Sequence, residues 1–348
     1  MNVARWWSAL HPPGFVLLGG AALCAAVLLW SAALRHVATR SRPPGAQQAL
    51  APTSAGSLLA PGDILITDGG PGCAEPRLVQ SHQGDQRTLL TGSPLAQPRQ
   101  IRVQTTNSDV RVLIADAGAG LIAFDPTTGR ATPLAPAQVL AAQAVALTPN
   151  GSILTLAGAP PATTLVLLTS PAAPPQPVSL SVPLTQPSAL LFSGQALLIA
   201  DASTGVYARL PGPSERVVTG APPATDLAGA ADGRVLLATS RGLWQIDSTL
   251  SAHQLLPRPV TAVATGGGRS YLLDGPAKVL HILDSSLNDV RDQTLADLCA
   301  PSGIAIYQGP PVFIPAPIGP AFSYCYPRQC TDEVLRELQS TSRRRPSP

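Results

Sequence analysis

Val110-Arg-Val-Leu-Ile-Ala-Asp116 is the stretch that decides the fold, because close copies of it recur along the chain. The copies occupy residues 62–68, 151–157, 195–201, 233–239, 269–274 and 311–316. The steps between their last residues, taken in chain order, are 48, 41, 44, 38, 35 and 42. Self-similarity at a period near forty residues indicates a repeat architecture, in which each copy is one supersecondary unit.

Each repeat unit has the composition of several short strands. In the second unit, apolar residues 110–115 are followed by a glycine turn, a second apolar run at 121–124, an Asp-Pro-Thr-Thr-Gly turn and a third run at 131–134. A further short strand is predicted before several units, at 144–147, 189–192, 225–227 and 261–263. Continuous runs such as 112–114 are typical of strands buried on both faces, as the inner strands of stacked blades are. We therefore predict an all-β fold, a β-propeller with four antiparallel strands per blade.

The number of copies bears on the number of blades. Seven copies favour seven blades, spanning residues 62–328. Six blades are the alternative, because the first unit lacks a clear leading strand and the last lacks a clear final one. Those two half-units would then complete one blade between the chain ends.

The repeat also resembles a known family. The order strand, Leu-Ile-Ala-Asp, glycine turn, strand, Asp-x-x-Thr-Gly turn and strand is similar to the NHL and YVTN type of propeller repeat. That repeat type also underlies the streptogramin lyase-like and gluconolactonase-like propellers. The resemblance implies either a binding platform or an enzyme with a polar cluster at one mouth of its channel.

The N-terminal region has the features of a membrane anchor. After a tail at residues 1–13, residues 14–34 form an uncharged stretch, which at about 1.5 Å per residue is long enough to span a bilayer as a helix. Trp6, Trp7 and Trp30 flank it, where aromatic side chains settle at membrane interfaces. The alternative is a signal peptide cleaved near residues 31–33, although the apolar run is longer than usual for one.

Two observations disagree about the side of the membrane on which the propeller lies. Arg35, Arg40 and Arg42 follow the span and only Arg5 precedes it, which by the positive-inside rule favours a cytoplasmic domain. A single lysine and four cysteines beyond the span favour an oxidising compartment instead. We favour a bacterial inner-membrane protein whose propeller lies in the periplasm. Its single N-terminal helix would span the membrane and contact the lipid. Residues 35–61, rich in Pro, Ala and Ser, are the linker between this helix and the propeller.

The composition excludes several classes of function. Only 12% of the residues are charged, the net charge is +3, and no basic stripe follows a predicted surface, so nucleic-acid binding is excluded as a partner class.

Helical periodicity is nearly absent before residue 331. Residues 329–348 are predicted to form a short helix and an arginine-rich tail.

Four aspartates end copies of the repeated strand: Asp68, Asp116, Asp201 and Asp274. One hypothesis is a ring of carboxylates that binds a cation in a central channel. The interpretation we favour is structural, because an Asp directly after a strand accepts N–H bonds from the following turn. The histidines His82, His253 and His281 occupy unlike positions in their units, so we predict no catalytic residue, no metal and no cofactor.

Four cysteines follow the span: Cys73, Cys299, Cys325 and Cys330. Because a propeller closes by joining its first and last blades, a bond from Cys73 to any of the other three would lock the ring. The sequence does not choose among the pairings, and reduced thiols in a cytoplasmic protein are the alternative.

The features together predict a membrane-anchored propeller that binds one or more protein partners in a membrane complex and has no catalysis of its own. The alternative is a lyase-like or lactonase-like enzyme with its site at one channel mouth. A third possibility is a ligand sensor that uses the central channel.

Overall fold

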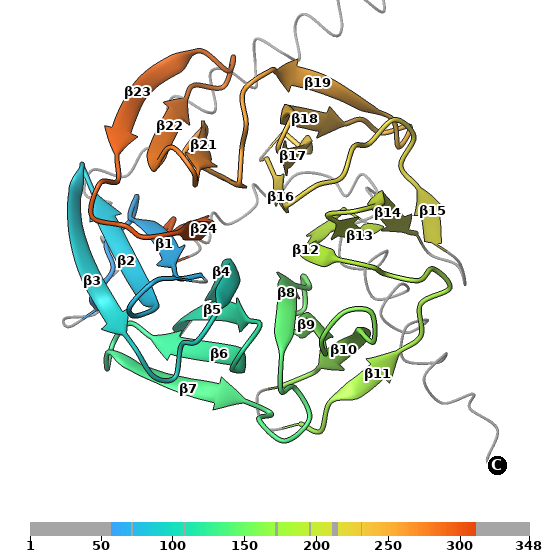
Figure 1. Cartoon of the computed structure of the whole chain (residues 1–348), viewed down its shortest axis with the longest axis horizontal. Helices are drawn as coiled ribbons and strands as arrows, with labels where there is room; N and C mark the ends of the chain where they lie inside the picture. The colour runs from blue at the N-terminus through green and yellow to red at the C-terminus, as the bar shows by residue number, and fades with distance from the viewer. Residues whose placement is uncertain are drawn as a thin grey trace, which may run out of the picture. The chain divides into compact units, whose positions relative to one another are not determined.

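The fold is a ring of six β-sheets, seen along its axis in Figure 1. The computed structural model describes residues 57–310, except 71, 107–108, 171–172, 195, 211–214 and 231. Every sheet has four strands, and all neighbouring strands within a sheet are antiparallel. The fold is therefore an all-β propeller with six blades.

Blade 1 is built from both ends of the described chain, from β24 (Pro301–Ile306), β1 (Ile64–Asp68), β2 (Arg77–His82) and β3 (Asp85–Thr91). Blade 2 contains β4 (Pro98–Thr105), β5 (Val110–Asp116), β6 (Gly120–Asp125) and β7 (Arg130–Leu134). Blade 3 contains β8 (Ala142–Leu147), β9 (Ile153–Ala157), β10 (Thr164–Leu168) and β11 (Gln176–Val178).

Blades 4 to 6 continue in chain order. Blade 4 contains β12 (Pro187–Ser193), β13 (Ala196–Asp201), β14 (Gly205–Arg209) and β15 (Glu215–Val217). Blade 5 contains β16 (Asp226–Gly229), β17 (Val235–Thr239), β18 (Gly242–Ile246) and β19 (Ala252–Leu256). Blade 6 contains β20 (Ala262–Gly266), β21 (Arg269–Asp274), β22 (Val279–Leu283) and β23 (Asp289–Thr294).

The prediction of seven blades is wrong. The leading strand that the first unit lacks is supplied by β24, which pairs with β1 in the register Ile64↔Ile306. The two half-units therefore complete one blade, and the ring closes at six. The seventh copy of the repeat, at residues 311–316, lies outside the described residues.

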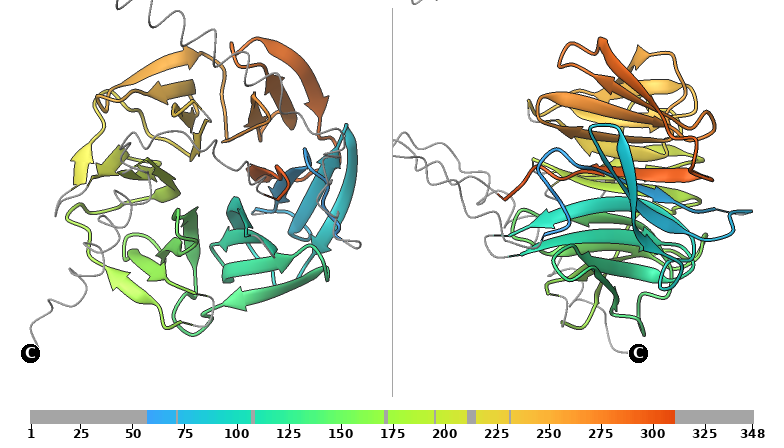
Figure 2. Two further views of the ribbon diagram at one scale, coloured as in Figure 1. Left: turned by 180° about the vertical axis from the view of Figure 1, so that it is seen from behind. Right: turned by 90° about the vertical axis from the view of Figure 1, so that its left-hand side faces the viewer.

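The repeated strand is the second of each blade, not the innermost. The strands β4, β8, β12, β16, β20 and β24 contact one another in turn around the axis, and Figure 2 shows the same ring from behind and from the side. The repeated strands β1, β5, β9, β13, β17 and β21 lie one position outward. Their apolar runs are continuous because they are still buried on both faces by the two neighbouring blades.

The core is divided among the blade interfaces. Six clusters of buried residues are found in the described part of the chain, one between each pair of adjacent blades. Alternation along β1 illustrates the division, because Ile64 and Ile66 pack against blade 6 whereas Leu65 packs against blade 2. Each apolar strand therefore joins two blades, which explains why an aliphatic side chain is needed at nearly every position.

Several sequence predictions fall outside the described residues. These are the span at 14–34 with Trp6, Trp7 and Trp30, the linker before residue 57, Cys325, Cys330 and the helix beginning near 331. Within the described residues, no helix has the length and apolarity needed to cross a bilayer.

Candidate functional site: the centre and the two mouths of the ring

The two faces of the ring are chemically different, and we name them by the inner strands. The clamp face is the face at which β4, β8, β12, β16, β20 and β24 begin, and the mouth face is the face at which they end. Because β1 is antiparallel to β24, it begins at the mouth face and ends with Asp68 at the clamp face. The same holds for the other repeated strands.

The inner strands would leave their edge N–H and C=O groups unpaired at the axis. Gln100, the third residue of β4, satisfies several of them. Its Oε1 accepts hydrogen bonds from the N–H groups of Val145 (2.8 Å) and Leu190 (3.3 Å), on blades 3 and 4. Its Nε2 donates to Oδ1 of Asp226 (2.8 Å) on blade 5. One side chain thus connects four blades.

An ion pair completes the bridge across the ring. Nη2 of Arg102 lies 3.2 Å from Oδ1 of Asp226 and also donates to the carbonyls of Leu227 (2.7 Å) and Leu190 (3.3 Å). Oδ2 of Asp226 accepts the N–H of Val263 (3.1 Å) on blade 6. Blades 2 and 5 lie opposite each other, so these contacts cross the axis. The centre is therefore filled by the protein's own polar side chains, with their charges balanced.

The central bridge was not predicted from the sequence. A partial signal existed, because Gln100 and Arg102 flank Ile101 in the segment that forms β4 and Asp226 directly precedes Leu227. A polar residue at such a position must find a partner when buried. The sequence could not show that the partners lie on opposite blades.

At the clamp face, three of the four repeat aspartates make the same contact. Asp116 ends β5 and accepts the N–H groups of Ala96 (2.8 Å) and Gln97 (2.9 Å), which precede the inner strand β4 of its own blade. It also accepts those of Gly118 and Ala119 in the following turn, both at 2.8 Å. The carboxylate of Asp116 therefore joins the loop that precedes β4 to the turn between β5 and β6.

Asp201 and Asp68 repeat this arrangement in blades 4 and 1. Asp201 accepts the N–H groups of Thr185 (2.7 Å) and Gln186 (2.8 Å) before β12. Burial raises the pKa of Asp201, but hydrogen bonds from Ser203, Gln186 and Thr185 outweigh that effect, and the net pKa is below its ordinary value. Asp68 accepts the N–H groups before β24, including Ala300 at 2.7 Å.

Asp274 differs, since it is half-buried and accepts one N–H, from Ala277 at 3.0 Å. The hypothesis of a cation-binding ring meets a chemical obstacle. The oxygens of Asp68, Asp116 and Asp201 already face N–H donors, which a cation would have to displace.

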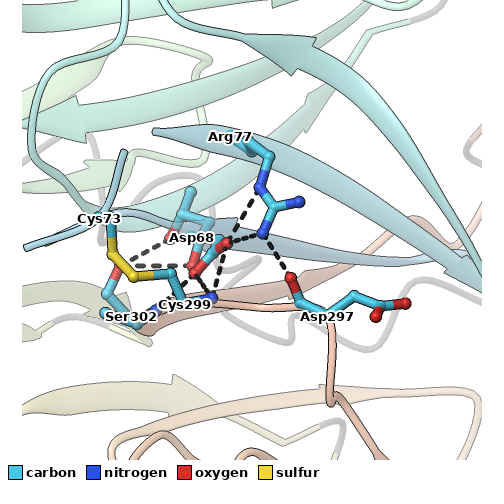
Figure 3. The surroundings of a disulfide bond; sticks show 8 residues. Asp68, Cys73, Arg77, Asp297, Cys299 and Ser302 are labelled. Carbon is cyan, nitrogen blue, oxygen red and sulfur yellow. Dashed lines mark hydrogen bonds and ion pairs between the residues drawn. A yellow bond between two sulfur atoms is a disulfide. The ribbon is translucent and has the colours of Figure 1, made fainter. Parts of the chain in front are cut away.

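A disulfide joins the two halves of blade 1 at the clamp face. Cys73, in the loop between β1 and β2, is bonded to Cys299, just before β24, across 226 residues of sequence. Figure 3 shows Asp68 and Arg77 beside it. Arg77 donates to Asp68 at 2.6 Å and to the carbonyl of Asp297 at 2.7 Å. Of the three possible partners of Cys73, the structure therefore selects Cys299.

The mouth face carries a cavity of about 350 Å³. It lies where β4, β8 and β24 end, and it is lined by Val103, Gln104, Thr105, Thr106, Leu147, Thr148, Pro149, Gly151, Ile306 and Gln308. No Asp, Glu, Lys, Arg or His is among these residues. The general acid and base that a lyase-like site requires are not part of this lining.

A smaller cavity of about 220 Å³ lies on the opposite side of the central bridge. It is lined by residues at the starts of β4 and β24, among them Arg99 and Ser302. The guanidinium of Arg99 gives this clamp-face opening a positive charge that the mouth-face cavity lacks.

The histidines come from three different blades. Nδ1 of His82 lies 2.6 Å from Oδ1 of the fully buried Asp63, where β1 begins. Nδ1 of His281 lies 2.7 Å from Asp292, and with Asp289 they form the one group in the described part of the chain with spacing suited to a metal. Both oxygens of Asp289 already bind Arg258, at 2.8 and 3.1 Å. His253 is exposed on β19 and belongs to neither pair.

The geometry defines a class of fold, the six-bladed propeller, and a likeness to one solved structure supports it. A chain from a nidogen/laminin complex is similar, with a TM-score of 0.59 and 11% identity over 70% of this chain and 97% of that one. An inactive variant of virginiamycin B lyase from Staphylococcus aureus, solved with quinupristin, has a TM-score of 0.47 and 14% identity over 70% of this chain and 86% of that one. No protein-family model and no curated protein matches the chain.

Proposed function

We propose that this chain is a membrane-tethered propeller that serves as a rigid protein-binding platform in a bacterial inner-membrane complex, with no chemistry of its own. The observation that carries the proposal is the bridge of Gln100, Arg102 and Asp226. It occupies the centre of the ring, where a substrate channel would run, and its polar groups bind one another and the strand edges. The surfaces left for function are the outer faces and the rim.

The disulfide supports a periplasmic position for the propeller. Stable disulfides between distant segments form in oxidising compartments and are rare in the cytoplasm. The Cys73–Cys299 bond therefore weighs against the arginine count that favours a cytoplasmic domain.

The way in which the chain enters the ring suggests where the partner binds. Residues 57–63 approach β1 from the mouth face, where the N–H of Leu58 donates to the carbonyl of Pro126 (2.8 Å) and Arg87 donates to the carbonyl of Leu58 (2.9 Å). A tether that joins the ring at the mouth face leaves the clamp face and the rim free for a partner. The similar propeller from the nidogen/laminin complex is itself known from an assembly of two proteins.

The binding proposal is tested with a photo-crosslinking amino acid incorporated into the full chain in cells. One position is Arg241, an exposed residue of the turn between β17 and β18 at the clamp face, and the matched control is Ser286, an exposed turn residue at the mouth face. We expect one protein to be crosslinked from Arg241 and to co-purify in a fixed ratio in detergent. A monomer that gives no crosslink at either position, or that turns over a lactone, would contradict the proposal.

The topology is tested separately with reporter fusions at the C-terminal end of the chain. An enzyme reporter that is active only in the periplasm should be active, and a reporter that fluoresces only in the cytoplasm should be dark. The reverse result would overturn the periplasmic position but would not test whether the propeller binds a partner.

A further inference from the structure

The cavity at the mouth face lies next to the point where the described chain ends. Ile306 and Gln308 line the cavity, and Pro310 is the last described residue. Nε2 of Gln308 donates to the carbonyl of Thr265 on blade 6 (3.3 Å), which holds this residue at the edge of the opening. Whatever follows Pro310 therefore begins within a few residues of the cavity.

The sequence that follows is unusually apolar. Residues 311–327 read PVFIPAPIGPAFSYCYP and contain no Asp, Glu, Lys, Arg or His. They include four of the fourteen aromatic residues of the chain and five prolines. Burying such side chains is favourable by about 25 cal/mol per Å² of apolar surface, so this segment gains free energy where it can bury them against apolar side chains.

The cavity matches this segment in chemistry. Val103, Leu147 and Ile306 offer apolar contacts, and its charge-free lining avoids desolvating an ionised group. The hydroxyl of Thr105 is suited to the carbonyls of a proline-rich segment, whose prolines supply acceptors but no N–H donors, whereas the hydroxyl of Thr106 already donates to the carbonyl of Asp109. The volume of about 350 Å³ is at the small end for a ligand pocket, and a few side chains fill it.

The covalent connection strengthens the match. Phe313 is three residues beyond Pro310, and an extended chain covers about 3.3 to 3.6 Å per residue, so its reach from Pro310 is about 10 Å. A short tether holds a binding segment at an effective concentration on the order of millimolar. Weak intrinsic affinity is then enough to keep the cavity occupied.

From these observations we propose that residues 311–318 of the same chain bind in the mouth-face cavity, with Phe313 and Ile314 as its apolar anchors. The occupant of the cavity is then a segment of the same chain. This inference is independent of the proposed platform function, and it directs a partner to the clamp face or the rim.

The test measures the accessibility of the cavity in the full chain in detergent. Thr105→Cys places a thiol in the cavity lining, and its alkylation is followed by mass spectrometry of the corresponding peptide. We expect alkylation to become at least about tenfold faster when Phe313→Asp and Ile314→Asp are added, because the charged segment no longer binds. Gly267→Cys, in an exposed hairpin on the same face outside the cavity, is the control and should not respond.

A second measurement identifies the occupant. A photo-crosslinking residue in place of Phe313 should form a bond within one chain to residues 103–106, 147–151 or 306–308. Bonds only to a second copy, to another protein or to a different blade would overturn the proposal. An alkylation rate that the aspartate substitutions leave unchanged would also overturn it, whether the cavity is open or filled by another ligand.

Discussion

The two faces of the ring differ in how they are held together. At the clamp face, a disulfide, three buried aspartates and Arg77 fix the loops that enter the inner strands. At the mouth face, the corresponding turns are short hairpins whose aspartates are partly or fully exposed, and the inner strands end at a cavity with no charged residue in its lining. The one buried aspartate described at that face is Asp63, which pairs with His82 within blade 1. The difference indicates that the contacts that close the ring are concentrated at the clamp face. The mouth face is therefore free to bind a ligand or a segment of chain.

The largest effect should come from removing the closure of blade 1. The double variant Cys73→Ser with Cys299→Ser should lose about 2 to 5 kcal/mol of unfolding free energy, because the unfolded chain is no longer constrained across a loop of 226 residues. Denaturant titration of the purified protein measures the loss. Reducing the wild-type protein should shift its midpoint in the same direction, whereas reductant should leave the variant unchanged. Equal midpoints for variant and wild type would show that the clamp face does not depend on this bond.

A glycine comparison should give the next largest effect. Gly120 begins β6 at the clamp face with a φ of 89°, and a Cβ there would collide with the carbonyl oxygen of Val139. Gly267 is in a mouth-face hairpin with a φ of 58° and open space around it. We expect Gly120→Ala to cost about 2 to 4 kcal/mol, from strain and collision together, and Gly267→Ala about 1 kcal/mol, from strain alone. Thermal melts that rank the two variants the other way would contradict the comparison.

The sequence allowed the blade to be predicted because each repeated strand carries its own evidence. The runs ending at Asp68, Asp116 and Asp201 are apolar at consecutive positions, and burial on both faces by neighbouring blades requires that pattern. The number of blades was predicted wrongly because closure is non-local. The strand that completes blade 1 lies 233 residues beyond Asp68, at Pro301, and a copy of the repeat at 311–316 was counted in its place.

The contacts of the polar residues, like the number of blades, could be predicted from the sequence only where they are local. A bond from Cys73 could be expected because ring closure brings the chain ends together, but the choice of Cys299 depends on positions in space. The pair of Arg102 and Asp226 joins residues 124 apart on opposite blades, which no local pattern reveals. The bonds that Asp116 accepts from the N–H groups of Gly118 and Ala119, by contrast, are local and follow from sequence, whereas those from Ala96 and Gln97 do not.

Acidification should affect the clamp face through Asp201. Its pKa in the folded protein is lowered, because hydrogen bonds from Ser203, Gln186 and Thr185 outweigh the effect of burial. Its contribution to stability is therefore fully present above the ordinary pKa of Asp, about 4, and is lost as the pH falls below that value toward the folded pKa. We expect Asp201→Asn to be less stable than wild type at pH 7, and this difference to shrink as the pH falls below about 4. A difference that stays constant with pH would contradict the assignment.

The smallest effects should come from single side chains near the surface, and one from each face can be compared directly. Arg77 donates to Asp68 and to the carbonyl of Asp297 at the clamp face, so Arg77→Ala removes a partner from a fully buried carboxylate and should cost about 1 to 3 kcal/mol. Gln308 makes one long hydrogen bond at the mouth, so Gln308→Ala should change the unfolding free energy by less than about 0.5 kcal/mol. Denaturant titration of both variants at pH 7 measures the contrast. If Gln308→Ala were as costly as Arg77→Ala, the mouth would be part of the closure of the ring, and the division between a stabilising face and a binding face would fail.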